Sequence, residues 1–188
     1  LKKAAGLQIR TICPLHGPIL NGDLTPYLQK YQTWSSYQPE ESGVMVAYAS
    51  IHGNTAKAAE FLSEQLWELG EQVTVLDLTR CDMSDAVQAA FRYDRMVLAA
   101  ASYDGGVFLP MEEFLLHLQA KAFQNRTVAL VENGSWAPSA AKKMRSYLDT
   151  MKNVTVLDTT VTIRSAVKQA DETALCELAK AVHETAKK

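Results

Sequence analysis

The chain has 188 residues, of which 47% are hydrophobic, enough for one domain of ordinary size with a short appendage. Its formal net charge of -2 gives no electrostatic reason to expect binding to nucleic acid or to an anionic membrane. No apolar run approaches the ~18 residues that a membrane helix needs, and no signal-peptide core follows Lys2 and Lys3.

The cysteines indicate the compartment. Cys13, Cys81 and Cys176 are odd in number, far apart in the sequence, and form no CxxC pair. This pattern disfavours a disulfide framework and a zinc site, and it favours a reducing cytoplasm. Because the first residue is Leu1, we expect the chain to be a fragment of a longer protein.

Two segments precede the main domain. Residues 1–38 are rich in proline and glycine and are expected to form an irregular extension that cannot bury a core alone. Residues 39–43 are polar, contain Pro39 and Gly43, and are expected to be a linker. The domain itself is expected to occupy residues 44–188.

Strand and helix patterns alternate regularly after residue 43. Apolar runs predict strands at 44–49, 73–76, 95–101, 127–131 and 154–157, the last extending as far as 163. Helical spacing predicts helices at about 55–69, 84–91, 110 onward, 139–151 and 171–185. This alternation predicts an α/β fold with a doubly wound, five-stranded parallel sheet of the flavodoxin-like order 2-1-3-4-5. A ligand of such a sheet lies beyond the carboxyl ends of the strands, at the switch point between the first and third strands.

The loop after the first predicted strand closes directly onto a helix. A helix start with free backbone N–H groups, glycine and polar side chains suits a phosphate. The loop lacks the Gly-Lys-Ser/Thr ending of a nucleotide-hydrolysing P-loop, and it lacks GxGxxG. A capped turn that binds nothing is an equal alternative. Its residues are Ser50, Ile51, His52, Gly53, Asn54 and Thr55.

The loops after the third and fourth predicted strands combine glycines with aromatic residues. Two glycines let the backbone lie flat against a planar ligand, and an aromatic side chain can cover a ring face. A flexible turn and a surface tryptophan that packs on its own loop are the plain alternatives. The candidate residues are Ser102, Tyr103, Asp104, Gly105 and Gly106 in one loop and Asn133, Gly134, Ser135 and Trp136 in the other. Together with the phosphate loop they predict a mononucleotide with a flat ring, for which FMN is the natural candidate.

The same loops resemble those of flavodiiron proteins, also called A-type flavoproteins. Residues 50–55 resemble the SxxGNT phosphate loop of that family, and residues 102–110 and 133–136 resemble its two further flavin loops. Residues 34–37 are similar to the family's domain junction. Residues 13–19, with His16, are similar to the end of its metallo-β-lactamase-like domain, where the corresponding histidine ligates a diiron site.

This resemblance implies a function for the intact protein. It implies reduction of dioxygen to water or of nitric oxide to nitrous oxide at a diiron site, in a homodimer. FMN relays electrons to that site from rubredoxin or a similar donor. Residues 1–38 are then the remnant of the diiron domain, and His16 is an iron ligand in the intact protein only, because the family's HxExDH motif does not occur here. This chain is expected to hold FMN without diiron and to have no catalytic residue of its own.

Two alternative functions remain open from the sequence. One is a stand-alone flavodoxin-like NAD(P)H:quinone reductase, which reduction by NAD(P)H alone would support. The other is a flavodoxin-like interaction module without FMN, which an inability to take up FMN would support.

Overall fold

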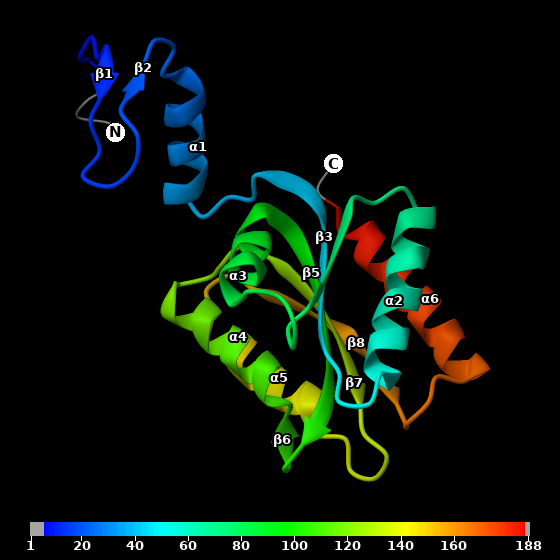
Figure 1. The fold of residues 1–188 in the computed structure, drawn as a ribbon. Helices are drawn as coiled ribbons and strands as arrows, with labels where there is room; N and C mark the ends of the chain where they lie inside the picture. Colours follow the sequence, from blue (N-terminus) through cyan, green and yellow to red (C-terminus); the bar gives the residue numbers. More distant parts are fainter. Residues whose placement is uncertain (1–5, 187–188) are drawn as a thin grey trace.

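Five parallel strands form the central sheet in the computed structural model, which describes residues 6–186 (Figure 1). Their order in the sheet is β4-β3-β5-β7-β8, and each neighbouring pair is parallel. Along the chain this is the order 2-1-3-4-5, so the predicted flavodoxin-like α/β fold is confirmed. The strands are β3 (Glu41–Ala49), β4 (Val73–Asp77), β5 (Tyr93–Tyr103), β7 (Thr127–Asn133) and β8 (Thr155–Ile163). A short strand, β6 (Gly106–Val107), pairs antiparallel with the end of β5.

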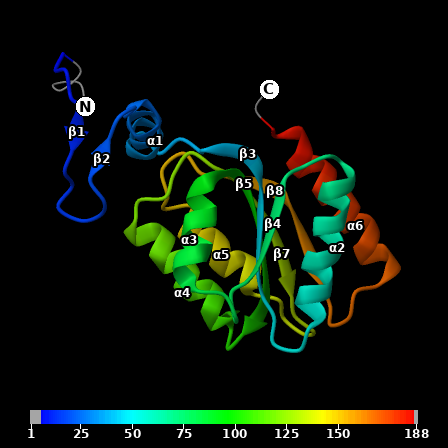
Figure 2. The same ribbon diagram turned by 45° about the horizontal axis from the view of Figure 1, so that its top comes forward.

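Five helices cover the two faces of this sheet. Helices α2 and α6 lie against one face, and α3, α4 and α5 lie against the other (Figures 1 and 2). Alternate residues of β3 point into the two cores, with Val44 and Val46 on the side of α2 and Met45 and Ala47 on the opposite side. The near-continuous apolar runs of the sequence therefore reflect strands buried on both faces. The helices are α2 (Asn54–Glu68), α3 (Met83–Arg92), α4 (Leu109–Ala120), α5 (Ala140–Leu148) and α6 (Gln169–Glu184).

The N-terminal extension is more regular than expected. It contains a two-stranded antiparallel sheet, β1 (Thr11–Ile12) and β2 (Leu20–Asn21), followed by helix α1 (Thr25–Ser35). The prediction of an irregular segment was wrong because proline was interpreted only as a breaker. Pro26 lies in the first turn of α1, where a missing N–H costs nothing, and Asp23 accepts a hydrogen bond from the Thr25 N–H over 3.0 Å.

The linker is shorter than expected because strand β3 begins at Glu41, inside the segment 39–43. Gly43 is buried in the sheet, where its N–H donates to Asp94 over 2.9 Å. A Cβ atom at this position would lie 2.8 Å from both the Gln72 carbonyl oxygen and the Tyr93 ring. The glycine therefore permits close packing here and does not mark a flexible connection.

None of the helices described for residues 6–186 has the length and apolar character needed to cross a membrane.

Candidate functional site

The loops at the carboxyl edge of the sheet enclose two adjoining cavities. One has a volume of about 210 Å³ and the other of about 340 Å³, and both are lined by Ser102, Gly134 and Ser135. Three loops that are far apart in the sequence thus meet around one hollow, at the switch point of the sheet. The larger cavity has a volume within the range typical of small-molecule sites.

Eleven of the fifteen predicted cofactor-binding residues line these cavities. The first cavity contacts Ile51, His52, Asn54, Ser102, Asn133, Gly134 and Ser135. The second adds Tyr103, Asp104, Gly105 and Trp136. The remaining four residues, Ser50, Gly53, Thr55 and Gly106, do not line either cavity.

Those four residues shape the loops. The Ser50 hydroxyl accepts a hydrogen bond from the Gly53 N–H over 3.1 Å, which closes the turn before α2. Gly53 has a φ of 83°, in the left-handed region that favours glycine. Thr55 is buried with 2% of its surface exposed, and the Gly106 carbonyl accepts a hydrogen bond from the Ser139 hydroxyl over 2.7 Å.

Helices α2, α3 and α5 all begin at this edge, and they differ in which groups accept hydrogen bonds from their first-turn N–H groups. The Asp82 side chain caps α3, whereas the first turn of α5 donates to Ser102 and Glu132. The N-cap of α2 is Gly53, which has no side chain to accept these bonds. The first-turn N–H groups of α2 therefore stay available to an anion next to His52 and Asn54, as a phosphate site requires.

Aromatic side chains border the second cavity. Trp136 has 93% of its surface exposed and Tyr103 has 47%, and the Tyr103 ring lies 5.8 Å from that of Phe108. Exposed rings beside a cavity can cover a planar ligand. The residues present thus fit a mononucleotide, with donors for a phosphate at α2 and aromatic surface for a ring near β6.

A fourth loop, which is not among the predicted site residues, also lines the first cavity. Ser165, which follows β8, lines the first cavity and has a φ of 68°. Its N–H donates to the Asn133 Oδ1 atom over 3.1 Å, and the Asn133 Nδ2 atom donates to its carbonyl over 2.9 Å. The Asn133 amide therefore holds this loop in place. Because β8 ends at the same edge as its neighbours, its loop could have been included from the strand pattern alone. Ala101, Ala137 and Ser139 were also missed.

His16 lies apart from this site, exposed in the segment between β1 and β2. Across the described part of the chain, no three His, Cys, Asp or Glu side chains are grouped as metal ligands.

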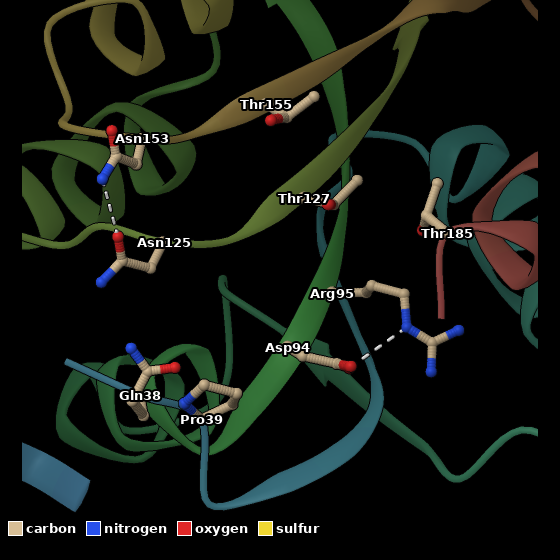
Figure 3. A pocket seen from close by; sticks show the side chains of 9 residues that line it. All are labelled: Gln38, Pro39, Asp94, Arg95, Asn125, Thr127, Asn153, Thr155 and Thr185. Atoms are coloured by element: carbon tan, nitrogen blue, oxygen red, sulfur yellow. Dashed lines mark hydrogen bonds and ion pairs between the residues drawn. The ribbon is translucent and has the colours of Figure 1, made fainter. Parts of the chain in front are cut away.

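A further cavity of about 290 Å³ lies at the opposite, amino edge of the sheet (Figure 3). Its polar side chains are largely bonded to protein partners. Arg95 pairs with Glu71 and Asp94, and the Asn153 amide donates to Asn125 over 3.1 Å. This cavity lacks both a free helix start and an exposed aromatic ring, so the carboxyl edge is the better candidate.

The fold and the loops at its carboxyl edge define a flavodoxin-type domain. A family model described as "Flavodoxin domain" matches residues 45–167, and the chain belongs to this family.

Known relatives extend this likeness over most of the chain. The chain is 24% identical over 178 residues to the putative diflavin flavoprotein A 1 of a Nostoc species, covering 94% of this chain and 30% of that protein. It is 24% identical over 146 residues to the anaerobic nitric oxide reductase flavorubredoxin of Klebsiella pneumoniae, covering 76% of this chain and 30% of that protein.

Solved structures show the same fold. The rubredoxin oxygen:oxidoreductase of Desulfovibrio gigas matches with a TM-score of 0.89 at 22% identity, covering 97% of this chain and 46% of that one. The flavodiiron protein from Giardia intestinalis matches with a TM-score of 0.85 at 15% identity, covering 97% of this chain and 46% of that one. This chain spans less than half the length of each of these relatives.

Proposed function

We propose that this chain binds FMN at the carboxyl edge of its sheet and serves as an electron-transfer module. The observation that carries the proposal is the meeting of an uncapped helix start, two adjoining cavities and exposed aromatic rings at one place. An oxidoreductase context follows from the relatives whose names state such activities. Bound FMN would supply the ability to accept and release electrons, and the chain would bind and orient it.

Each loop has a part in this binding. The first-turn N–H groups of α2, with Asn54 and His52, would hold the phosphate. Tyr103 and Trp136 would contact the ring, and the backbone near Gly105 and Gly106 would meet its polar edge. The neutral character of most lining residues is consistent with a phosphate held by hydrogen bonds and the helix dipole.

The intact protein would be a flavodiiron-type oxidoreductase. Residues 1–38 would be the end of a metallo-β-lactamase-like domain, and residues 44–188 the FMN domain. FMN would relay electrons from rubredoxin or a similar donor to a diiron site that reduces dioxygen or nitric oxide, in a homodimer. Support comes from the names of the relatives and from exposed apolar side chains in the extension, among them Leu15 with 98% and Ile19 with 64% of their surface exposed. The cytoplasmic location stays a prediction from the cysteines.

Reconstitution tests the proposed function. The purified chain is mixed with excess FMN and separated by gel filtration, and we expect one FMN per chain in the protein peak by absorbance. A colourless protein peak would overturn the proposal and favour the interaction module. Rapid reduction of bound FMN by NAD(P)H alone would favour the quinone reductase.

A further inference from the structure

A buried carboxylate lies directly behind the cavity-lining loop. Glu132, in β7, has 7% of its surface exposed and immediately precedes Asn133 and Gly134, which line the first cavity. Its Oε2 atom accepts a hydrogen bond from the Ala141 N–H over 2.9 Å, and its Oε1 atom accepts one from the Thr162 hydroxyl over 2.9 Å. One side chain thus connects β7 with both α5 and β8.

No Lys or Arg among residues 6–186 forms an ion pair with Glu132. Its compensation comes from the start of α5, where backbone N–H groups carry partial positive charge. A buried carboxylate without a cationic partner is costly to keep unless its hydrogen bonds are specific. We therefore expect Glu132 to have a role other than filling space between β7 and α5.

The contacts of Glu132 hold the end of the loop that contains Trp136. This loop spans residues 134–139, and its far end joins α5, whose first turn donates to Ser102 as well as to Glu132. The Ser102 hydroxyl accepts from the Ser139 N–H over 2.9 Å and from the Ala140 N–H over 3.2 Å. Gly134, at the near end, has no room for a side chain, because a Cβ atom would lie 3.0 Å from the Ser102 hydroxyl. The Gly134 N–H donates to the Ile163 carbonyl over 3.0 Å, so the loop is tied at both ends to strands of the sheet.

We propose that Glu132 is a positioning residue of the FMN site, and that its negative charge favours oxidised over reduced FMN. The proposal rests on the proposed function. Its first part follows from the bonds to Ala141 and Thr162, which fix the loop that lines both cavities. Its second part follows from charge. Dithionite reduces FMN by two electrons, and with the uptake of one proton the ring gains one net negative charge. The Glu132 carboxylate is buried and adjoins Asn133 and Gly134, which line the first cavity, so solvent screens it poorly and it repels that charge.

Three variants separate position from charge. Glu132→Gln keeps a side chain of the same shape that can bond to Ala141, but it removes the charge. Glu132→Ala removes both, and Thr162→Val removes one hydrogen bond while the charge stays. Glu112→Gln is the matched control, because Glu112 also accepts a hydrogen bond, from Tyr147 over 2.6 Å, and pairs with Lys143 over 3.3 Å, but has no neighbour in the sequence that lines either cavity.

The first readout is binding of oxidised and dithionite-reduced FMN to each variant, followed by fluorescence and absorbance. For Glu132→Gln we expect an affinity for oxidised FMN close to that of the wild type. We expect its affinity for reduced FMN, relative to oxidised FMN, to rise by roughly tenfold. Thr162→Val and Glu112→Gln should keep the wild-type ratio. An unchanged ratio in Glu132→Gln would overturn the role of the charge.

The second readout needs no FMN. Amide hydrogen exchange of the FMN-free chain should be faster over residues 133–141 in Glu132→Ala and near normal in Glu132→Gln. Glu132→Ala should also bind oxidised FMN about tenfold more weakly, as expected when a buried hydrogen-bonding network is broken. Wild-type exchange together with wild-type affinity in Glu132→Ala would overturn the positioning role. Failure of the wild type to bind FMN would instead overturn the proposed function, and the exchange comparison would still test positioning.

Discussion

The Arg126 side chain donates a hydrogen bond from Nη1 to the Tyr37 carbonyl oxygen over 2.8 Å, joining the end of the N-terminal extension to the start of β7. Arg126 has 3% of its surface exposed, and it also donates to the Tyr93 and Phe91 carbonyls over 2.7 Å each. Burial lowers the pKa of Arg126 to about 10, so the guanidinium stays charged at neutral pH. This side chain therefore anchors the extension on the flavodoxin-type domain.

Replacing Arg126 should destabilise the chain strongly. Arg126→Met removes the donor to the buried Tyr93 carbonyl and to the partly buried carbonyls of Phe91 and Tyr37, and we expect a loss of about 3 kcal/mol in the free energy of unfolding. Urea unfolding, monitored by circular dichroism, measures this loss. Arg145→Met is the matched control, because Arg145 donates to a single carbonyl, that of Leu157, and should cost less. Equal stability of Arg126→Met and the wild type would contradict the anchoring role.

The ion pair between Arg95 and Glu71 predicts a pH dependence. Two bonds of 2.6 and 2.7 Å join the side chains, and His183 contacts Glu71 over 2.7 Å. Burial raises the pKa of Glu71, but hydrogen bonds from Arg95 and His183 outweigh it and hold the pKa below the ordinary value of 4.5. The stabilisation is therefore complete above about pH 4.5 and is lost as the pH falls through the lowered pKa.

Glu71→Gln tests this contribution. The substitution removes one of the two carboxylates that pair with the buried Arg95 and leaves only Asp94, so we expect a loss of about 2 kcal/mol at pH 7. Between pH 5 and pH 3 the stability of the variant should fall less steeply than that of the wild type. Urea unfolding over this pH range measures both effects. Glu41→Gln, at an exposed pair with Arg92, should change the stability much less. If the free energy of unfolding fell equally steeply with pH in the variant and in the wild type, the role assigned to Glu71 would be refuted.

Gly43 should not tolerate a side chain. In Gly43→Ala the Cβ atom would meet the Gln72 carbonyl and the Tyr93 ring at 2.8 Å, so the strand has to shift. We expect a loss of about 2 kcal/mol in the free energy of unfolding, as for other overpacked sites. Thermal unfolding measures it, with Gly6→Ala as the control because nothing lies within 4 Å of a Cβ atom there. An unchanged melting temperature would argue against the close approach.

The chain should distinguish FMN from riboflavin. Riboflavin lacks the phosphate, and charge-assisted hydrogen bonds contribute about 1.5–3 kcal/mol each. FMN should therefore bind at least roughly a hundredfold more tightly than riboflavin. Fluorescence titration with both flavins measures this ratio. Asn54→Ala should weaken FMN binding and leave riboflavin binding nearly unchanged, whereas Asn21→Ala, in β2, should alter neither. Equal dissociation constants for the two flavins would show that the loop before α2 binds no phosphate.

Iron should not alter the chemistry of this chain. His16 is the one residue assigned as an iron ligand, and within residues 6–186 it does not belong to a group of three or more His, Cys, Asp or Glu side chains that could hold a metal ion. We expect no stoichiometric iron binding, no formation of nitrous oxide from nitric oxide, and no effect of His16→Ala on flavin reduction. Iron analysis and product analysis, with and without added ferrous iron, check this. Binding of two irons with nitrous oxide formation that depends on His16 would contradict the expectation.

The sequence alone determined the fold and which loops meet at the carboxyl edge of the sheet. Strands buried on both faces appear as apolar runs such as residues 44–49, and the alternation with helical spacing leaves few arrangements open. Because parallel strands end at one edge, polar and glycine-rich loops after several of them had to meet there. Both inferences depend on local periodicity, which a single chain carries in its own residues.

Tertiary contacts decided the rest, because they join residues that are distant in the sequence. Nothing in the sequence indicates that the first turn of α5 donates hydrogen bonds to Glu132, or that Ser102, a predicted site residue, also accepts from that turn. Likewise, the role of Gly43 as a close-packing residue depends on Gln72 and Tyr93, and the tie between Arg126 and Tyr37 spans 89 positions. A hydrogen bond or a steric limit of this kind leaves no periodic pattern, so it becomes visible only in the folded chain.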